Sequence, residues 1–488
     1  MRADDLPLEI WLHITRFIPD ATIRSMIAVN SFFYNLSMDL RYKSLELQRI
    51  NSRTRILLNR LADPAVGTRV HALTASPDFR FYGTGGRAPS MRDRFQNVLH
   101  TFHLAGPILR PEEEGTYALI SALPYMTNVK AFTIDSHSWG QHSGPELSTF
   151  LSTAWTTFGS NLRKLSLRGH AASFRTIISS QPALPMVEEL FFELIDNPLS
   201  STRQADADTL VTVFAPFINS FSSRLQALTL WAWASIELSG LFNTLNKFPL
   251  LTCFNFQTSF PRTFRIDPSS LSGFLRNHCS QLDILVLRLN TTPLLHAIST
   301  EQRLSEWTLK TFEENHFSRL HELQLYPSAL PEGFRGLLSC IQQSADTLQN
   351  LVVRERYLDP DDVITLLNVL PLGLRSLRLN LRELNVELFD VITSRLPTLS
   401  SLSLYISNVS TTFTSDMEAR TFNNLKLHNV GVWQSGSTAN EIMRVIGRTI
   451  PSVNSFWSLG TTDIEASNDR ELEPIVDWST RNIDDGIH

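Results

Sequence analysis

The stretch PLGLRSLRLN, from Pro371 to Asn380, contains a pattern that returns along most of the chain. In LRSLRL the first, fourth and sixth residues are apolar, and the last part alternates as a strand with one buried face does. Clear copies also start at Leu162, Val187, Leu225, Leu251, Leu282, Leu320, Leu348 and Leu399, and weaker ones at Tyr42, Val70, Leu99, Val129, Phe422 and Val453. The fifteen copies are on average about 29 residues apart, which predicts a repeat architecture.

The segments between the copies have helical spacing. DPSSLSGFLRNHC from Asp267 and DPDDVITLLNVL from Asp359 both open with Asp and then Pro. Asp can cap the first amides of a helix, and Pro fits its first turn. Each repeat is therefore predicted to run helix, turn, strand, and such units stack with parallel strands on one side and helices on the other.

This array, over roughly residues 40–460, resembles irregular leucine-rich-repeat domains. The resemblance implies an α/β fold: a leucine-rich-repeat-like solenoid with strands on the concave side and helices on the convex side. The Asn or Cys that usually follows the strand is missing from most copies, and only LRLN at Leu287 and at Leu377 keeps an Asn close by. A doubly wound α/β enzyme is the alternative, but the glycine cluster at Tyr82 lacks both the P-loop lysine and the GxGxxG spacing.

Composition limits the function classes. The 488 residues are 42% apolar and 19% charged, with a net charge of −5, which indicates a globular protein too long for one ordinary core. No basic block stands out, so we expect no nucleic-acid partner. The three cysteines match neither a disulfide framework nor a zinc pattern, and no secretory or membrane-spanning segment is evident. We therefore expect an intracellular protein, cytoplasmic or nuclear.

The N-terminal segment LPLEIWLHITRFI, residues 6–18, is unusually apolar for a chain end. It is predicted to form the first of three short helices, the second starting near Asp20 and the third after Ser31. About forty residues cannot bury this much apolar surface alone. Another part of the molecule or a partner must cover some of it.

The three-helix segment resembles an F-box, whose pattern opens Leu-Pro-x-Glu-Ile and continues with apolar residues at helical spacing and a turn like VNSFFYNL from Val29. The resemblance implies a small all-α domain that binds a Skp-type adaptor and, through it, the cullin and RING subunits of an SCF ubiquitin ligase. By that resemblance the adaptor-binding residues are Leu6, Pro7, Ile10, Trp11, Ile14, Phe17, Ile23 and Phe33, although some of them must hold the three helices together. The alternative is a leucine-rich-repeat scaffold unrelated to ubiquitin, whose first helices only cap the array.

Strand residues between the buried leucines point to the concave face, because side chains alternate along a strand. Trp, Tyr and Arg dominate binding hot spots. The residues predicted to bind a target protein are Trp231, Trp233, Arg288, Tyr326, Arg354, Arg378 and Tyr405. Thr229, Arg168, Glu193, Gln324 and His428 are expected on the same face. The arginines suggest an acidic or phosphorylated target; the alternative for the tryptophans is packing under a loop.

Catalytic chemistry is not expected. The pairs His100/His103 and His137/His142 lack further metal ligands, no Gly-x-Ser-x-Gly elbow is present, and we expect neither metal nor cofactor. The predicted domains are the F-box-like segment 1–45, the array 46–460, and an acidic tail or cap over 461–488.

Overall fold

Parallel strands and helices alternate along the part of the chain that the structure describes. The computed structural model describes residues 7–47, 52–76, 111–136, 145–180, 183–195, 203–265, 267–289, 298–326, 330–434 and 439–457. It forms two compact units, Met1–Leu225 and Gln226–His488. Leu6, the copy at Leu99, the glycine cluster at Tyr82, the four paired histidines and the tail 461–488 lie outside the described residues.

Among the described residues, the first unit begins with three helices and contains five strands. Its strands pair in parallel with the next in chain order: β1 (Ser44–Leu47), β2 (Ala72–Ala75), β3 (Ala131–Asp135), β4 (Lys164–Gly169) and β5 (Glu189–Leu194). Its α-helices are α1 (Leu8–Thr15), α2 (Asp20–Ser25), α3 (Ser31–Tyr42), α4 (Ser52–Leu61), α5 (Pro64–Gly67), α7 (Pro111–Ala122), α8 (Pro145–Phe158), α9 (Ala171–Ser179), α10 (Arg203–Thr209) and α11 (Ala215–Asn219). Because β1 crosses the predicted boundary at residue 45, the three helices run directly into the array.

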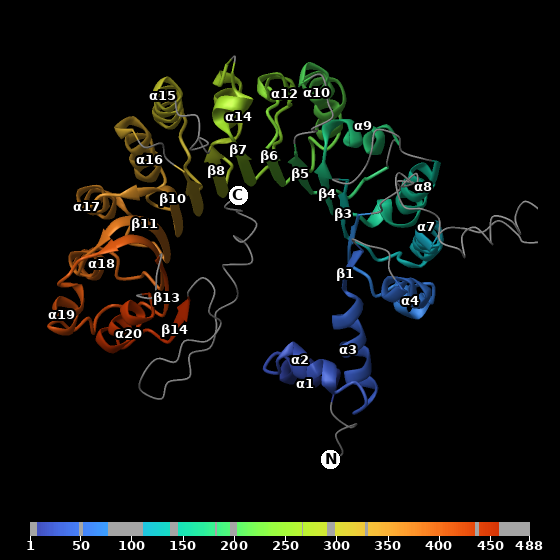
Figure 1. Cartoon of the computed structure of the whole chain (residues 1–488), viewed down its shortest axis with the longest axis horizontal. Coiled ribbons are helices and arrows are strands. Elements are labelled where there is room, and N and C mark those ends of the chain that lie inside the picture. The colour runs from blue at the N-terminus through green and yellow to red at the C-terminus, as the bar shows by residue number, and fades with distance from the viewer. Residues whose placement is uncertain are drawn as a thin grey trace, which may run out of the picture. The chain divides into compact units, whose positions relative to one another are not determined.

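The second unit repeats the same strand–helix alternation. Its strands are β6 (Ala227–Ala232), β7 (Cys253–Thr258), β8 (Ile284–Leu289), β9 (Glu322–Leu325), β10 (Asn350–Leu358), β11 (Ser376–Leu384), β12 (Ser401–Val409), β13 (Asn429–Gln434) and β14 (Ser455–Trp457), again parallel and in chain order. Its helices are α12 (Ser239–Thr244), α13 (Phe260–Thr263), α14 (Ser269–His278), α15 (Ile298–Glu314), α16 (Pro331–Gln343), α17 (Pro360–Val369), α18 (Glu387–Arg395), α19 (Phe413–Glu418) and α20 (Ala439–Thr449). The strands of this unit line the inner, concave side of its curve and the helices its outer side (Figure 1).

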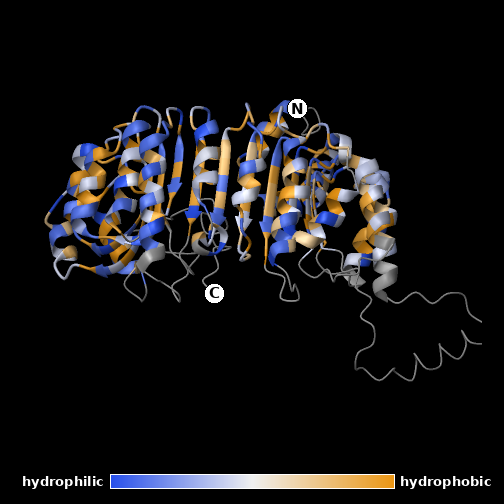
Figure 2. Cartoon of the chain, turned by 90° about the horizontal axis from the view of Figure 1, so that it is seen from above, coloured by the Kyte–Doolittle hydropathy of each residue, from blue (hydrophilic) through white to orange (hydrophobic). Residues whose placement is uncertain are grey.

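This is the predicted leucine-rich-repeat-like α/β architecture, and the register explains why the pattern encodes it. Leu351, Leu377 and Leu402 are partners across β10, β11 and β12, and all three are fully buried. The repeat thus stacks its leucines into a continuous core, where truncating one to alanine typically costs about 2–5 kcal/mol. Hydrophobic and hydrophilic residues are mixed along the helices, as expected for helices with one buried face (Figure 2).

A main-chain ladder at the start of the strands joins successive repeats. The carbonyl of His321 accepts from the amides of Gln349 and Asn350, both at 2.9 Å, and the carbonyl of Gln349 accepts from Arg375 and Ser376 at 2.8 and 3.0 Å. A side-chain hydroxyl group makes a further bond between repeats, because Thr347 Oγ1 donates to the carbonyl of Leu320 at 2.8 Å. These bonds join neighbouring repeats in an array where most copies lack the usual Asn or Cys.

Two expectations from the sequence need correction. The copy at Phe422 is displaced, because β13 starts at Asn429 and buries Val430 and Val432, so the pattern begins at Leu427. His428 therefore lies exposed at the edge before the strand and not on the concave face. Asp359 is the N-cap residue of α17, but its side chain makes no capping hydrogen bond; its carboxylate pairs instead with Arg382 at 2.9 Å.

His278, fully buried at the end of α14, is a neutral imidazole. The amide of Phe248 donates to its Nε2 at 2.9 Å, and Nδ1 lies 2.7 Å from the carbonyl of Phe274, so Nδ1 carries the proton. Burial, with a smaller contribution from Lys247, lowers the pKa of His278 below its ordinary 6.5.

A pH dependence of stability follows from His278. The unfolded chain takes up a proton at this residue below about pH 6.5 while the folded chain does not, so the free energy of unfolding falls as pH drops below that value. The loss approaches about 1.4 kcal/mol per pH unit until the folded pKa is reached. Urea unfolding at pH 7 and pH 5 should therefore show a smaller difference for His278→Gln than for the unmodified chain. The exposed His321→Gln is the control, and an equal change in both variants would contradict the prediction.

Candidate protein-binding surfaces

Helices α1–α3, which we call the helical tip, are held together by an aromatic core. Asn30 caps α3 by accepting from the amide of Phe33 at 3.0 Å. The Trp11 ring stacks on Phe32 at 5.7 Å and meets Phe33 edge-on at 5.3 Å. Ile23 and Phe33 are buried within this core. They were predicted as adaptor contacts, but both side chains are buried and therefore do not lie on the surface of the tip.

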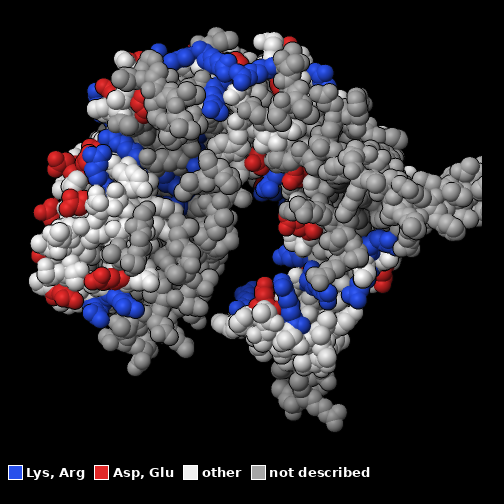
Figure 3. All heavy atoms as spheres, viewed as in Figure 1, with Lys and Arg blue, Asp and Glu red and all other residues white. Residues whose placement is uncertain are grey.

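An exposed apolar strip lies on α1 and on the turn that follows it. Ile10 and Ile14, four residues apart, share one side of the helix, and Phe17 lies in the turn two residues after the helix ends; we call these three residues the tip surface. Phe17 is 76% exposed and Ile10 46%. Pro7 is also exposed and Trp11 half-buried. In Figure 3 the described residues in the lower part of the tip are mostly uncharged. Partly apolar surface of this kind on a short helix is typical of an interaction site.

The tip is tied to the first unit through α3. The Arg69 guanidinium, just after α5, bonds Asp39 Oδ1 at 2.5 Å and Asn35 Oδ1 at 2.9 Å, both on α3. Tyr42 at the end of α3 is buried, and β1 follows directly. Helix α3 can thus act as a cap on the array. A capping role for α3 does not account for the exposed strip on α1 and the turn after it.

The concave face of the second unit carries arginines interleaved with aromatic rings. The Arg288 Cζ lies 5.7 Å from the Trp233 ring centroid and 5.4 Å from that of Tyr326. The Arg354 Cζ is 5.8 Å from Tyr326, and its Nη1 donates to the Tyr326 hydroxyl at 3.3 Å. Four of the predicted target-binding residues are therefore in contact with one another in a series. They lie on β8 and β10 and just after the ends of β6 and β9.

The series resumes on the next three strands. The Arg378 Cζ lies 4.6 Å from the Tyr405 ring centroid and 5.4 Å from that of Trp433, and its Nη2 bonds the Tyr405 hydroxyl. Tyr405 and Trp433 stack at 4.7 Å with an interplanar angle of 15°. We call the whole set the arginine–aromatic row, and its members are Trp233, Arg288, Tyr326, Arg354, Arg378, Tyr405 and Trp433.

The predicted target-binding residues differ in how deeply they are buried. Trp231, Trp233, Arg354 and Tyr405 are half-buried, so neither tryptophan is fully packed under a loop. Arg288, Tyr326 and Arg378 are more than nine-tenths buried. The structure therefore buries three of the residues that were predicted to bind a target. The two arginine groups lie against neighbouring rings, which accounts for part of their burial.

Trp433 was missed by the sequence analysis because the copy at Phe422 was read in the wrong frame. In the correct frame, Val430, Gly431, Val432 and Trp433 alternate as in the other strands. A Cβ at Gly431 would lie 2.6 Å from the Trp433 ring, so the glycine lets that ring lie flat on β13. In register, Asn380, Tyr405 and Trp433 are partners across β11, β12 and β13.

Three buried polar atoms on this face lack hydrogen-bond partners among the described residues. They are Gln257 Oε1, Asn380 Oδ1 and Trp433 Nε1, each on a side chain more than nine-tenths buried. Leaving a buried donor or acceptor unsatisfied costs about 1–3 kcal/mol. Two acceptors and one donor thus have no hydrogen-bond partner among the described residues.

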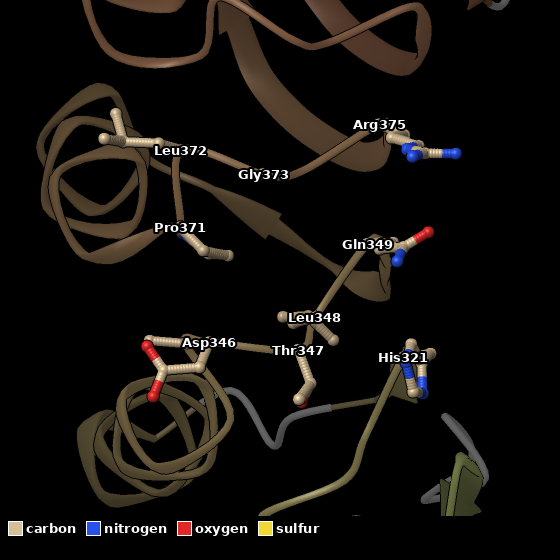
Figure 4. A pocket seen from close by; sticks show the side chains of 10 residues that line it. His321, Asp346, Thr347, Leu348, Gln349, Pro371, Leu372, Gly373 and Arg375 are labelled. Atoms are coloured by element: carbon tan, nitrogen blue, oxygen red, sulfur yellow. The ribbon is translucent and has the colours of Figure 1, made fainter.

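The outer helices of the second unit carry charged side chains of both signs, and a groove lies at the edge of the sheet where the strands begin. Seen in Figure 3, acidic and basic side chains mix on the outer helices of the second unit, with pairs such as Arg420–Asp390 at 2.5 Å. A groove of about 530 Å³ lies between the turns before β10 and β11 (Figure 4). Its His321, Gln349 and Arg375 each precede a strand, so the groove reflects the repeat spacing.

Among the described residues, no group of three or more His, Cys, Asp and Glu side chains could hold a metal ion. The thiol of Cys340 on α16 is fully buried, and burial raises its pKa far above the ordinary value. No described helix is long and apolar enough to cross a bilayer.

Comparison with known proteins gives only distant likenesses. No protein-family model and no curated protein matches the chain. Yeast Rad7 in its complex with Elc1 is 14% identical, with 98% of this chain and 99% of that chain covered and a TM-score of 0.38. TLR13 in its complex with ssRNA13 is 16% identical (70% and 43% covered, TM-score 0.33), and a Bacteroides fragilis protein 11% identical (71% and 75%, TM-score 0.32). Likenesses at this level carry no argument about function.

Proposed function

We propose that the chain is the substrate-recognition subunit of an SCF-type ubiquitin ligase. In this proposal the helical tip binds a Skp-type adaptor, and the concave face of the second unit binds a target protein. The protein itself performs no chemistry, because the cullin and RING subunits bring the activated ubiquitin. The tip surface is the observation that carries the proposal.

Two features of the tip support adaptor binding. Ile10, Ile14 and Phe17 match the apolar positions of the F-box pattern and are exposed, while Ile23 and Phe33 form the core that orients them. Fully burying one such side chain contributes about 1.5–3 kcal/mol. Three of them on a short helix and the turn after it are enough to anchor a partner.

The second candidate is a protein-interaction scaffold without a ligase. The continuity of α3 with β1 and the Arg69 contacts to α3 favour it, since both fit a helical cap. The two functions make opposite predictions for the tip surface. A cap needs these residues for the stability of the array, and an F-box needs them only for its partner.

The deciding experiment is a binding measurement between the purified full-length chain and the Skp-type adaptor of the same organism. Calorimetry should give a one-to-one complex, and adding the cullin and RING subunits should give an assembly that elutes as one species. A folded full-length chain that fails to bind the adaptor at concentrations of about 100 μM would leave the scaffold function as the better account.

A further inference from the structure

We propose that Arg69 is a positioning residue, which holds α3 at a fixed angle to the strands of the first unit and so sets the direction in which the helical tip presents its partner. The inference goes beyond the proposed function, because it holds whichever protein the tip binds. The feature that makes such a residue necessary is the joint between α3 and β1.

The chain connection between the tip and the array is one residue long. Helix α3 ends at Tyr42 and β1 begins at Ser44, so only Lys43 separates them (Figure 1). A helix of 12 residues is about 18 Å long, and a rotation of about 20° at its end would move the other end by about 6 Å. The tip therefore needs contacts beyond this joint if it is to keep one orientation.

Arg69 supplies such contacts, because its guanidinium group bonds both α5 and α3. Its Nε donates to the carbonyl of Ala65 at 2.9 Å, which ties the group to its own segment. Its Nη1 donates to the carbonyl of Asn35 at 3.1 Å and to Asp39 Oδ1 at 2.5 Å, and its Nη2 donates to Asn35 Oδ1 at 2.9 Å. The planar shape of the group lets one side chain bond three acceptors on α3 while it stays attached to α5.

The contacts on α3 are spread along the helix axis. Asn35 and Asp39 are four residues apart, and the buried Tyr42 follows three residues later. These spacings place all three residues on one side of the helix. Contacts at Asn35 and Asp39 are about 6 Å apart along the axis, so they restrain the tilt of α3, whereas a single contact would let it pivot.

The segment that carries the arginine is itself closely attached to the array. Asn128, just before β3, donates to the carbonyl of Thr68 at 2.7 Å. A Cβ at Gly67 would lie 2.7 Å from the carbonyl oxygens of both Leu61 and Tyr125, so α5 packs directly against main chain on two sides. The bonds from the arginine to α3 therefore connect the tip to a tightly packed part of the unit.

The test measures the distance between the tip and the array in the full-length chain by double electron–electron resonance. Spin labels are attached at Val29→Cys in the tip and at Ala172→Cys on α9, both at exposed positions. The two partly exposed native thiols are removed by Cys253→Ser and Cys279→Ser. With Arg69 present, the labels should give one narrow distance distribution, and Arg69→Gln should broaden it by about 6 Å, the displacement expected for a free joint.

Three further variants separate the bonds to α3 from charge alone. Arg69→Lys keeps the charge but lacks the planar fork that bonds two turns of α3, so it should broaden the distribution as Arg69→Gln does. The control, Arg60→Gln, removes an exposed arginine at the end of α4 and should leave the distribution unchanged. Asn35→Ala removes one acceptor at an exposed position of α3 and should broaden the distribution by a smaller amount. This last variant decides where Arg69→Gln does not fold.

Two results would overturn the proposal. One is a broad distribution for the chain that retains Arg69, and the other is an unchanged narrow distribution for a folded Arg69→Gln. A lower urea midpoint without broadening gives the second result and makes Arg69 only a stabilising contact of the array.

Adaptor binding is measured separately on the unlabelled chain. The affinity of Arg69→Gln should stay within about twofold of the unmodified chain, because the arginine bonds α3 and the tip surface lies on α1 and the turn after it. An unmodified chain that binds no adaptor would count against the proposed function, while the distance distributions would still decide this inference.

Discussion

Phe17→Asp is expected to abolish detectable binding of the Skp-type adaptor while the chain stays folded. The change removes an apolar contact worth about 1.5–3 kcal/mol and places a carboxylate where the partner would exclude water. Together these effects amount to at least about 3 kcal/mol, or more than about a hundredfold in affinity. The stability of the chain should change little, because Phe17 is 76% exposed.

The matched control for Phe17→Asp is Ile56→Asp on α4. Ile56 is also an exposed apolar residue of the first unit, at 59%, but it lies outside the helical tip. Calorimetry with the adaptor should give unchanged affinity for this control. If Phe17→Asp instead lowers the urea midpoint of the array while the unmodified chain shows no adaptor binding, the tip is a cap and the F-box proposal fails.

Gly169→Ala is expected to destabilise the first unit by about 3 kcal/mol or more. Gly169 ends β4 with φ of +143°, a conformation that residues with a side chain rarely adopt. A Cβ there would lie 2.0 Å from Ser136 Oγ and 3.1 Å from the Ser136 carbonyl carbon. Ser136 cannot easily move, because its amide and its hydroxyl both bond the carbonyl of Arg168, at 2.7 and 2.9 Å.

The measurement for Gly169→Ala is urea unfolding followed by circular dichroism, with Gly273→Ala as control. A Cβ at Gly273, inside α14, would meet nothing within 4 Å. Alanine there should raise stability by up to about 1 kcal/mol, since glycine is a poor helix former. Opposite signs for the two variants are the expected result; a neutral Gly169→Ala would show that β3 and β4 can shift apart at no cost.

The fold was predictable because one pattern sets strand, register and core together. Once Leu374, Leu377 and Leu379 are assigned to one buried face, the equivalent leucines of the next repeat must align with them. The edges of the pattern were less reliable. At Phe422 the residues FNNLKL imitate the repeat five positions before the true copy at Leu427, and only the burial of Val430 and Val432 identifies the correct frame.

The sequence could place residues on a face of a strand, but it could not show how deeply each side chain is buried. Alternation along the strands placed Arg288, Arg354 and Arg378 on the concave face, because that depends only on the period of two. Whether a side chain on that face is exposed to solvent or buried depends on the side chains of the neighbouring strands. The stacking of Arg378 on Tyr405 joins residues 27 positions apart, which no local pattern encodes. The same holds for Ile23 and Phe33, whose burial depends on how α1–α3 pack.

The main-chain ladder before the strands has a consequence for how such a chain can evolve. Because the bonds between repeats are made by carbonyls and amides, they do not depend on which side chains occupy positions such as His321, Gln349 and Arg375. A repeat can therefore be duplicated, lost or lengthened between strands while its neighbours still bond to one another. Within such an array, selection on the concave face acts on one residue of each strand at a time, and recognition can diverge without rebuilding the scaffold.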